Sequence, residues 1–221
     1  MIKLLNIQKS YQDGENRLNR VLCGVNMKID KGEFVAVKGA SGAGKTTLLS
    51  ILGTLLLPDE GSYLLNNVEL TAPNTDRSLI RNKQIGFVFQ DHRLLPQYSA
   101  LENILLPTLA YSSQTSAEHI EYARMLMKLT HISRIANQYP HTLSGGEASR
   151  VAVCRALIMK PLLLLADEPT GQLDAENARN IALLLSDINK NLQTTIVMVT
   201  HSDEISQSAS RMLTLNEGGL V

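Results

Sequence analysis

The sequence is poor in cysteine and carries no excess charge of either sign. Its two cysteines among 221 residues, Cys23 and Cys154, are too few and too isolated for a disulfide framework or a cysteine-rich metal site. Lysine and arginine number 21 together, and aspartate and glutamate also number 21, so the formal net charge is zero. Charge therefore gives no indication of nucleic acid or an anionic lipid surface as a partner.

Long apolar runs are also missing. The purely apolar stretches, of which residues 162–166 are an example, fall far short of the roughly 18 residues that a membrane-spanning helix needs. Residues 1–6 have neither the apolar core nor the small-residue cleavage site of a signal peptide. We find no internal repeats and no low-complexity linker. We therefore expect a soluble cytosolic protein, and 44% hydrophobic residues are ample for one large core.

Apolar and polar residues alternate in a way that predicts strands and helices in turn. Residues 1–38 read as short strands separated by turns at residues 12–14 and 30–32. Further strands are expected at about 61–70, 85–89, 162–166, 195–200 and 212–215, and helices at 46–57 (halted by Pro58), over 99–138, after Ser144 and at 175–191. Such alternation favours a parallel sheet with helices on both faces. The helical middle is interpreted as an inserted subdomain.

A complete phosphate-binding loop follows the apolar segment 34–37. It reads Gly39-Ala40-Ser41-Gly42-Ala43-Gly44-Lys45-Thr46 and matches G-x-x-x-x-G-K-[ST]. Glycines let successive N–H groups turn inward as an anion nest, and the helix that follows presents its positive end to the phosphates. Lys45 places a positive charge near the β- and γ-phosphates, and the Thr46 hydroxyl is placed to ligate Mg²⁺.

Two carboxylates end the apolar segment 162–166. Asp167 and Glu168 would lie at the carboxyl edge of a parallel sheet, where ligands bind in such folds. An acidic pair at a strand end is common by itself. Beside a phosphate loop, Asp167 is expected to hold Mg²⁺ through water, and Glu168 to polarise the attacking water.

A second glycine-rich turn, Leu143-Ser144-Gly145-Gly146-Glu147, lies about a hundred residues after the phosphate loop. Together the two turns resemble the nucleotide-binding subunit of an ATP-binding-cassette (ABC) transporter. The resemblance implies a P-loop NTPase fold with a mainly parallel sheet, an N-terminal antiparallel β subdomain and an inserted helical subdomain. We expect one domain over residues 1–221, with the helical subdomain at approximately 91–150.

The resemblance extends to single residues in the family order. It implies ATP binding by the loop residues 39–46 and Thr47, stacking of Tyr11 on adenine, and a Mg²⁺ contact from Gln90. It also implies that His201 contacts the γ-phosphate and that Gln90, Glu168 and His201 form the catalytic set. Taken singly, a tyrosine, a glutamine or a histidine at such positions is more often a packing or surface residue.

The second turn has the same anion-binding chemistry as the first, because Ser144 offers a hydroxyl and Gly145 and Gly146 allow close approach to backbone N–H groups. The family resemblance implies that these residues, with Asp174, act on ATP held by a second copy of the chain. Two chains would then close head to tail on two ATP molecules.

Details of the motifs resemble one branch of the family. This branch contains the subunits that serve lipoprotein release, macrolide-type efflux, antimicrobial-peptide detoxification and cell division. Two features resemble it: Glu147 as the fifth residue of the second turn, and residues 85–90 followed by Leu94-Leu95-Pro96. Gln172, where asparagine is usual, and Ala148-Ser149 depart from that branch.

We therefore expect an ATPase that uses ATP and Mg²⁺ and forms a homodimer, or a heterodimer with a second ATPase chain. It would energise a separate integral membrane permease from the cytoplasmic face of the inner membrane, as a peripheral protein without a nucleic-acid partner. The alternative is a cell-division ATPase that signals to wall hydrolases without moving a solute. A third class, ABC proteins that act on ribosomes or DNA, usually adds a second cassette, zinc cysteines or long coiled coils.

The histidines His92, His119, His131 and His141 have no metal-ligand spacing and are expected at the surface or at hinges. The basic residues Arg77, Arg81 and Lys83 are expected to form a solvated face.

Overall fold

The computed structural model describes residues 1–12, 14 and 18–221, and its N-terminal part is an antiparallel sheet. The strand order is β2-β1-β4-β5. The strands are β1 (Ile2–Gln12), β2 (Leu18–Ile29), β4 (Glu60–Leu65) and β5 (Val68–Glu69). The expected N-terminal antiparallel β subdomain is confirmed. Of the expected turn at 12–14, Asp13 lies outside the described residues.

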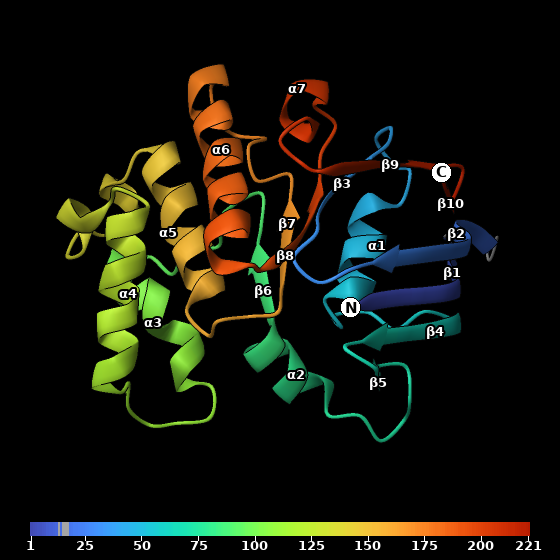
Figure 1. Ribbon diagram of the computed structural model, residues 1–221, viewed down its shortest axis with the longest axis horizontal. Helices are drawn as coiled ribbons and strands as arrows, with labels where there is room; N and C mark the ends of the chain where they lie inside the picture. The colour runs from blue at the N-terminus through green and yellow to red at the C-terminus, as the bar shows by residue number, and fades with distance from the viewer. Residues whose placement is uncertain (13, 15–17) are drawn as a thin grey trace.

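The second sheet is mainly parallel and lies in the middle of the molecule (Figure 1). Its order is β10-β9-β3-β8-β7-β6, and only the β9–β10 pair is antiparallel. The strands are β3 (Phe34–Lys38), β6 (Ile85–Val88), β7 (Leu163–Asp167), β8 (Thr195–Val199), β9 (Arg211–Asn216) and β10 (Gly219–Leu220). This arrangement confirms the expected fold class.

Alternation along β3, β7 and β8 divides the core in two. Successive side chains of a strand point to opposite faces, so Val35 and Val37 join one hydrophobic cluster while Phe34 and Ala36 join the other. The first cluster contains the inner face of the antiparallel sheet and helix α1 (Lys45–Leu52). The second is covered by the helices on the other side. The parallel sheet is therefore buried on both faces, which explains its continuous apolar strands.

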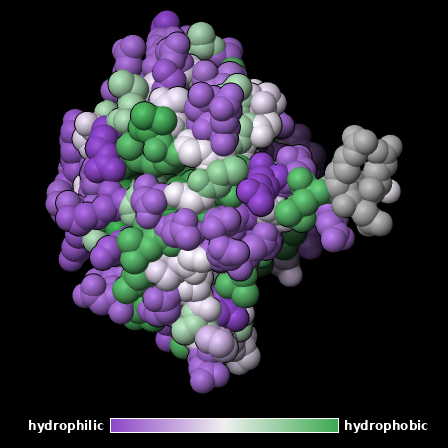
Figure 2. Space-filling model, turned by 90° about the vertical axis from the view of Figure 1, so that its right-hand side faces the viewer, coloured by the Kyte–Doolittle hydropathy of each residue, from purple (hydrophilic) through white to green (hydrophobic). Residues whose placement is uncertain are grey.

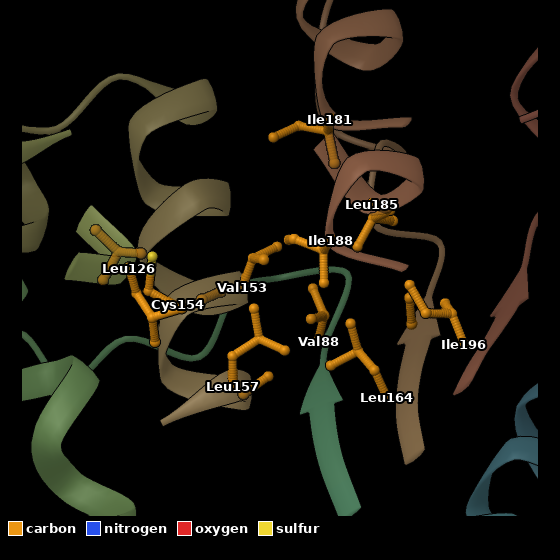
Figure 3. Close-up of a cluster of buried hydrophobic side chains, with 14 of the residues drawn as sticks. Val88, Leu126, Val153, Cys154, Leu157, Leu164, Ile181, Leu185, Ile188 and Ile196 are labelled. Atoms are coloured by element: carbon orange, nitrogen blue, oxygen red, sulfur yellow. The ribbon is translucent and has the colours of Figure 1, made fainter. Parts of the chain in front are cut away.

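The remaining helices follow β5 in the sequence, and most of them contribute buried or partly buried side chains to the second cluster. They are α2 (Arg77–Gln84), α3 (Ala100–Leu105), η1 (Leu106–Leu109), α4 (Ala117–Leu129), η2 (Ser133–Ile135), η3 (Pro140–Thr142), α5 (Gly145–Leu157), α6 (Ala175–Leu192) and α7 (Asp203–Ser206), of which α2 alone has no buried residue among the α-helices. In Figure 3, side chains of α5 and α6 meet Val88, Leu164 and Ile196 from three adjacent strands. The boundary of the helical subdomain at 91–150 stays a prediction.

Helix α1 is shorter than the sequence predicts. It ends at Leu52 with Gly53 as its C-cap, five residues before the expected end. A Cβ on Gly53 would lie 2.0 Å from Cε2 of Phe87, so glycine is required there. Thr54 then takes a left-handed φ of 56°, which turns the chain out of the helix. Tertiary packing against Phe87, rather than Pro58, ends this helix.

Two of the three basic residues expected on a solvated face are instead structural. Arg77 donates to the backbone oxygens of Leu70 and Ala72, and Arg81 donates to the backbone oxygen and hydroxyl of Thr54. That expectation is therefore wrong for Arg77 and Arg81, because both guanidinium groups satisfy loop carbonyls. Lys83 is exposed as expected.

Among the described residues, no helix combines the length and the apolar character that crossing a membrane requires. In the view of Figure 2, which faces the antiparallel sheet side of the molecule, hydrophilic and hydrophobic residues are intermingled.

Asn103 connects helix α3 to the segment that follows Gln90. Its side chain is fully buried, and its Nδ2 donates to the backbone oxygens of Leu95, Tyr98 and Ser99 at 2.9–3.1 Å. Its Oδ1 accepts from the backbone N–H of Leu95 at 2.8 Å. One buried amide thus bonds to four backbone groups of residues 95–99 and fixes the shape of this segment.

We expect Asn103→Ala to lower the free energy of unfolding by about 2–4 kcal/mol, since four hydrogen bonds of one buried side chain are lost together. Urea denaturation would measure the change. The exposed Asn137 provides a matched control, and Asn137→Ala should change stability by no more than about 0.5 kcal/mol. Equal effects of the two substitutions would contradict this role for Asn103.

Candidate functional site

The phosphate loop connects β3 to α1, where the two sheets meet. Two of its glycines have left-handed backbones, with φ of 80° at Gly42 and 97° at Gly44. A Cβ on Gly44 would lie 2.8 Å from Cγ1 of Val21 on β2, so both the backbone conformation and the space exclude larger residues. The loop is therefore shaped by its glycines and closed on one side by β2.

Helix α1 begins without a side-chain cap, unlike every other α-helix in the described part of the chain. The other α-helices begin with a capping side chain, from Asp76, Ser99, Ser116, Ser144, Asp174 and Ser202. The first N–H groups of α1 thus have no side-chain acceptor, and the helix dipole adds positive potential at the same point. This combination is an anion site.

Lys45 lies over the loop that it follows. Its Nζ donates to the backbone oxygens of Gly39 and Ala40 at 2.8 and 3.0 Å. Lys45 is one of the residues that line a pocket of about 390 Å³. The pocket is lined by Val21, Ser41, Gly42, Gly44, Lys45, Thr46, Thr47, Gln90, Asp167 and Glu168. Nine of these ten were expected from the sequence. Val21 was not, because only strand pairing brings β2 beside the loop.

The acidic pair ends β7 at the edge of this pocket. Burial raises the pKa of Asp167, and the neighbouring charge of Glu168 raises it further. A hydrogen bond from the Thr46 side chain and the charge of Lys45 act in the opposite direction. A partly desolvated carboxylate beside a hydroxyl and an ammonium group is suited to a cation and a polyphosphate bound together.

Glu168 is held in one position by the backbone and by His201. Its φ of 44° is left-handed, its N–H donates to the backbone oxygen of Val199 at 3.0 Å, and its Oε2 lies 2.9 Å from Nδ1 of His201. The His201 side chain is 70% exposed and that of Glu168 is 14% exposed. The exposed histidine therefore contacts a carboxylate that is mostly shielded from solvent.

Gln90 comes two residues after the end of β6 and also lines the pocket. Its Nε2 lies against Gly171, where an added Cβ would be 3.2 Å away. Gln90 and the loop that follows Glu168 are therefore neighbours, so a displacement of either one requires the other to move.

Tyr11 lies near the end of β1, paired with Asn19 of β2. Its side chain is 43% exposed and does not line the pocket. Lys9 places its Nζ 5.8 Å from the ring centroid. Stacking on adenine stays a prediction for this ring.

The second glycine-rich turn, residues 143–147, is called the signature turn from here on. It lies at the start of α5, away from the pocket. None of Ser144, Gly145, Gly146 and Asp174 lines it, and Figure 1 places α5 and α1 in opposite halves of the molecule. Ser144 and Gly145 are exposed, whereas Gly146 is buried against Asn177, whose Oδ1 an added Cβ would meet at 2.8 Å.

Asn177 connects the signature turn to the start of α6. Its N–H and Nδ2 donate to the two carboxylate oxygens of Asp174 at 2.9 and 2.6 Å. These bonds hold the pKa of Asp174 below its usual range. No local sequence pattern indicates Asn177, because its role depends on the packing of α5 against α6.

His92 does not lie at the surface, so the surface position expected for it is wrong, and the alternative of a hinge position stays a prediction. Its side chain is 8% exposed, and Nδ1 has no partner among the described residues. Burial lowers the pKa of His92. Its backbone oxygen and that of Arg93 accept hydrogen bonds from Arg155 of α5. The segment after Gln90 is thereby fixed to the same helix that begins with the signature turn.

The donor set fits Mg²⁺ held together with phosphates. Thr46, Asp167 and Gln90 supply hydroxyl, carboxylate and amide oxygens, which are the hard ligands that this ion prefers. No group of three or more His, Cys, Asp or Glu side chains suited to a metal occurs in the described residues. A dedicated protein cage is not needed, because Mg²⁺ is usually bound through one or two carboxylates and substrate phosphates.

These features define a P-loop nucleoside triphosphatase. A family model described as ABC transporter matches residues 22–171. The lipoprotein-releasing system ATP-binding protein LolD of Pseudoalteromonas translucida is 42% identical over 221 residues, which are 100% of this chain and 94% of that protein. The macrolide export ATP-binding/permease protein MacB of Chlorobaculum tepidum is 41% identical over 222 residues, covering 100% of this chain and 34% of that protein.

A solved dimeric ATP-binding cassette, in a post-hydrolysis state bound to ADP and Pi, has a TM-score of 0.89 and 38% identity to this chain. The match covers 100% of this chain and 96% of that one. The chain belongs to the ABC transporter family and is an ATP-binding, ATP-hydrolysing cassette. The family and the enzyme class expected from the sequence are confirmed.

The raised pKa of Asp167 predicts a pH-dependent stability. Because burial raises the folded-state pKa above 3.8, the stability present below pH 3.8 is lost as pH rises through the folded pKa. Asp167→Asn should therefore stabilise the protein relative to the wild type at neutral pH, and the advantage should vanish toward pH 4. Urea titrations without nucleotide or Mg²⁺ would measure the difference. The exposed Asp187 provides the control, since Asp187→Asn should shift stability by about 0.5 kcal/mol at most. An advantage that grows on acidification would contradict the prediction.

Proposed function

We propose that this protein is the ATPase subunit of a lipoprotein-releasing transport system. It would work as a homodimer, or with a second ATPase chain, at the cytoplasmic face of the inner membrane. There it would drive a separate integral membrane permease as a peripheral subunit. The observation that carries the head-to-tail dimer in this proposal is the separation of two anion-binding turns in the fold, because only one of them borders the chain's own phosphate pocket.

Each turn would serve a different chain of the dimer. The phosphate loop, residues 39–47, would hold ATP in cis, with Tyr11 against the adenine ring. Ser144, Gly145 and Gly146 would close on the nucleotide of the other chain, and Asp174 would contact the opposite site. The exposure of Ser144 and Gly145 supports this arrangement, since donors that meet a second chain must first be accessible. Two such contacts related by a twofold axis form a closed dimer.

Hydrolysis would depend on positioning and electrostatics. Lys45 and the α1 N-terminus would bind the phosphates, and Glu168, fixed by its backbone and by His201, would orient the attacking water. Mg²⁺, held by Thr46, Asp167 and Gln90, would neutralise charge on the β- and γ-phosphates. His201, whose side chain is exposed, would contact the γ-phosphate. Gln90, which lies beside Gly171, would change position when the bound nucleotide changes.

Transmission to the permease would run through the helical subdomain at about 91–150. The segment after Gln90 supports this, because Asn103 and Arg155 fix it to α3 and α5. A movement at Gln90 would therefore be carried into the helical layer rather than absorbed by a loose loop.

The similar relatives favour lipoprotein release over macrolide export, because LolD proteins of several organisms are 39–43% identical to this chain. The match to LolD proteins extends over 94–96% of several of them, whereas it spans about a third of the MacB proteins, which join ATP-binding and permease parts in one chain. The two alternatives differ in the partner that they require, so identifying the partner separates them.

The head-to-tail dimer can be tested in a slow-hydrolysis background. Glu168→Gln should keep ATP bound but slow its hydrolysis by at least about a hundredfold, because an amide is a poor base. Light scattering should then show an ATP-dependent dimer. Adding Gly145→Asp places a carboxylate against the phosphates of the other chain, and like charges repel at close range. The dimer should disappear while binding of a fluorescent ATP analogue to the monomer survives.

Two results would contradict the head-to-tail arrangement, in which the signature turn of one chain contacts the nucleotide of the other. If the double variant still dimerises with ATP, the signature turn does not contact the second nucleotide. If the folded double variant loses ATP binding as a monomer, the turn acts within its own chain. Gly14→Asp, at a described glycine with no atom near its Cβ position, controls for the added charge.

The partner can be tested by purifying the tagged chain from detergent-solubilised membranes. We expect an integral membrane protein to co-purify in ATP-sensitive amounts and to be required for release of a lipoprotein from vesicles. Stimulation of ATPase activity by a macrolide exporter partner instead would favour the efflux alternative. Recovery of ribosomal proteins alone would oppose the transport function.

A further inference from the structure

The signature turn carries a negative charge of its own. Oε2 of Glu147 accepts hydrogen bonds from the backbone N–H and the hydroxyl of Ser144, both at 2.9 Å, and the Ser144 hydroxyl accepts from the Glu147 N–H at 3.3 Å. This reciprocal capping box fixes the carboxylate next to the exposed Ser144 and Gly145. These bonds, the Ser144 N–H foremost and Arg134 last, lower the pKa of Glu147, so it is ionised at neutral pH.

A carboxylate in this place conflicts with anion binding. Under the proposed function the same turn meets the phosphates of a second chain's ATP, and like charges at close range repel. The N-terminus of α5 adds positive potential, but the dipole amounts to only about half a unit charge. The turn therefore needs a full positive charge to become an acceptable surface for a polyphosphate.

Arg134 supplies that charge. It lies on η2, 13 residues before Glu147, and its Nη2 donates to the second carboxylate oxygen, Oε1, at 3.0 Å. The arginine side chain is 81% exposed and that of Glu147 is 19% exposed, so the guanidinium covers the carboxylate from the solvent side. Arg134 makes no other hydrogen bond or ion pair in the described part of the chain. An exposed pair of this kind contributes little to folding stability.

We propose that Arg134 is a positioning residue for ATP-driven dimerisation, which neutralises and orients the Glu147 carboxylate so that the signature turn can receive the phosphates of a second chain. This role rests on the proposed function, because it needs the turn to act on the nucleotide of another copy. The guanidinium works through Glu147 and needs no phosphate contact of its own.

A double-mutant cycle in the Glu168→Gln background tests the proposal. The ATP-dependent dimer dissociation constant would be measured by light scattering for the parent and for Arg134→Ala, Glu147→Gln and the combined variant. Arg134→Ala should weaken the dimer about tenfold, because a loss of about threefold occurs at each of two symmetric turns. Glu147→Gln should remove this sensitivity, so that adding Arg134→Ala to it changes the constant by less than about twofold.

Further measurements separate this role from a structural one. The affinity of the monomer for a fluorescent ATP analogue and the unfolding midpoint should stay unchanged in Arg134→Ala, and Arg134→Lys should restore most of the dimerisation. The effect should shrink at about 0.5 M salt, since exposed charges are then screened. Arg124→Ala, which removes the same charge from an exposed position on α4, is the matched control and should leave the dimer intact.

The outcomes distinguish a failure of the role of Arg134 from a failure of the head-to-tail dimer. If Arg134→Ala weakens the dimer equally with Glu147 and with Gln at position 147, the arginine contacts the phosphate directly and the proposal is wrong. If it has no effect in a parent that dimerises, only the role of Arg134 fails. If the parent itself forms no ATP-dependent dimer, the head-to-tail arrangement fails, and the role of Arg134 fails with it.

Discussion

The structure depends on one constraint, which is the burial of α1 between two sheets. Its four buried residues, Leu48, Leu49, Ile51 and Leu52, are at most 1% exposed and join the antiparallel sheet to the inner face of the parallel one. This packing fixes the helix so that its first N–H groups can stay without a side-chain cap. The unfavourable end of one helix thus becomes the binding site, stabilised by hydrophobic contacts elsewhere along the same helix.

The rest of the site is assembled from the carboxyl ends of neighbouring parallel strands. Asp167 and Glu168 follow β7, His201 comes shortly after β8, and Gln90 comes shortly after β6. Strand pairing alone brings these segments together from distant parts of the sequence. Contacts beyond the pocket then join it to the helical layer, through Gln90 with Gly171 and through Arg155 with the segment after Gln90.

Charge is handled differently at the two anion-binding turns. The phosphate loop carries a fixed cation, Lys45, and its two nearby carboxylates lie on the side suited to a metal ion. The signature turn has a carboxylate within its own cap and an arginine from another segment beside it. One turn is positive by its own sequence, whereas the carboxylate of the other is neutralised only where η2 and α5 lie side by side.

The sequence by itself determined the family, the fold class and most of the pocket, because each motif acts within a few residues and carries its chemistry in residue type and spacing. The phosphate loop, the acidic pair and the signature turn are of this kind. Only the tertiary structure decided the early end of α1 at Gly53, the burial of His92, the structural bonds of Arg77 and Arg81, and the roles of Val21, Asn177 and Arg134. Each of these depends on a contact between segments that are separate in the sequence, and local pattern carries no information on which segments will meet.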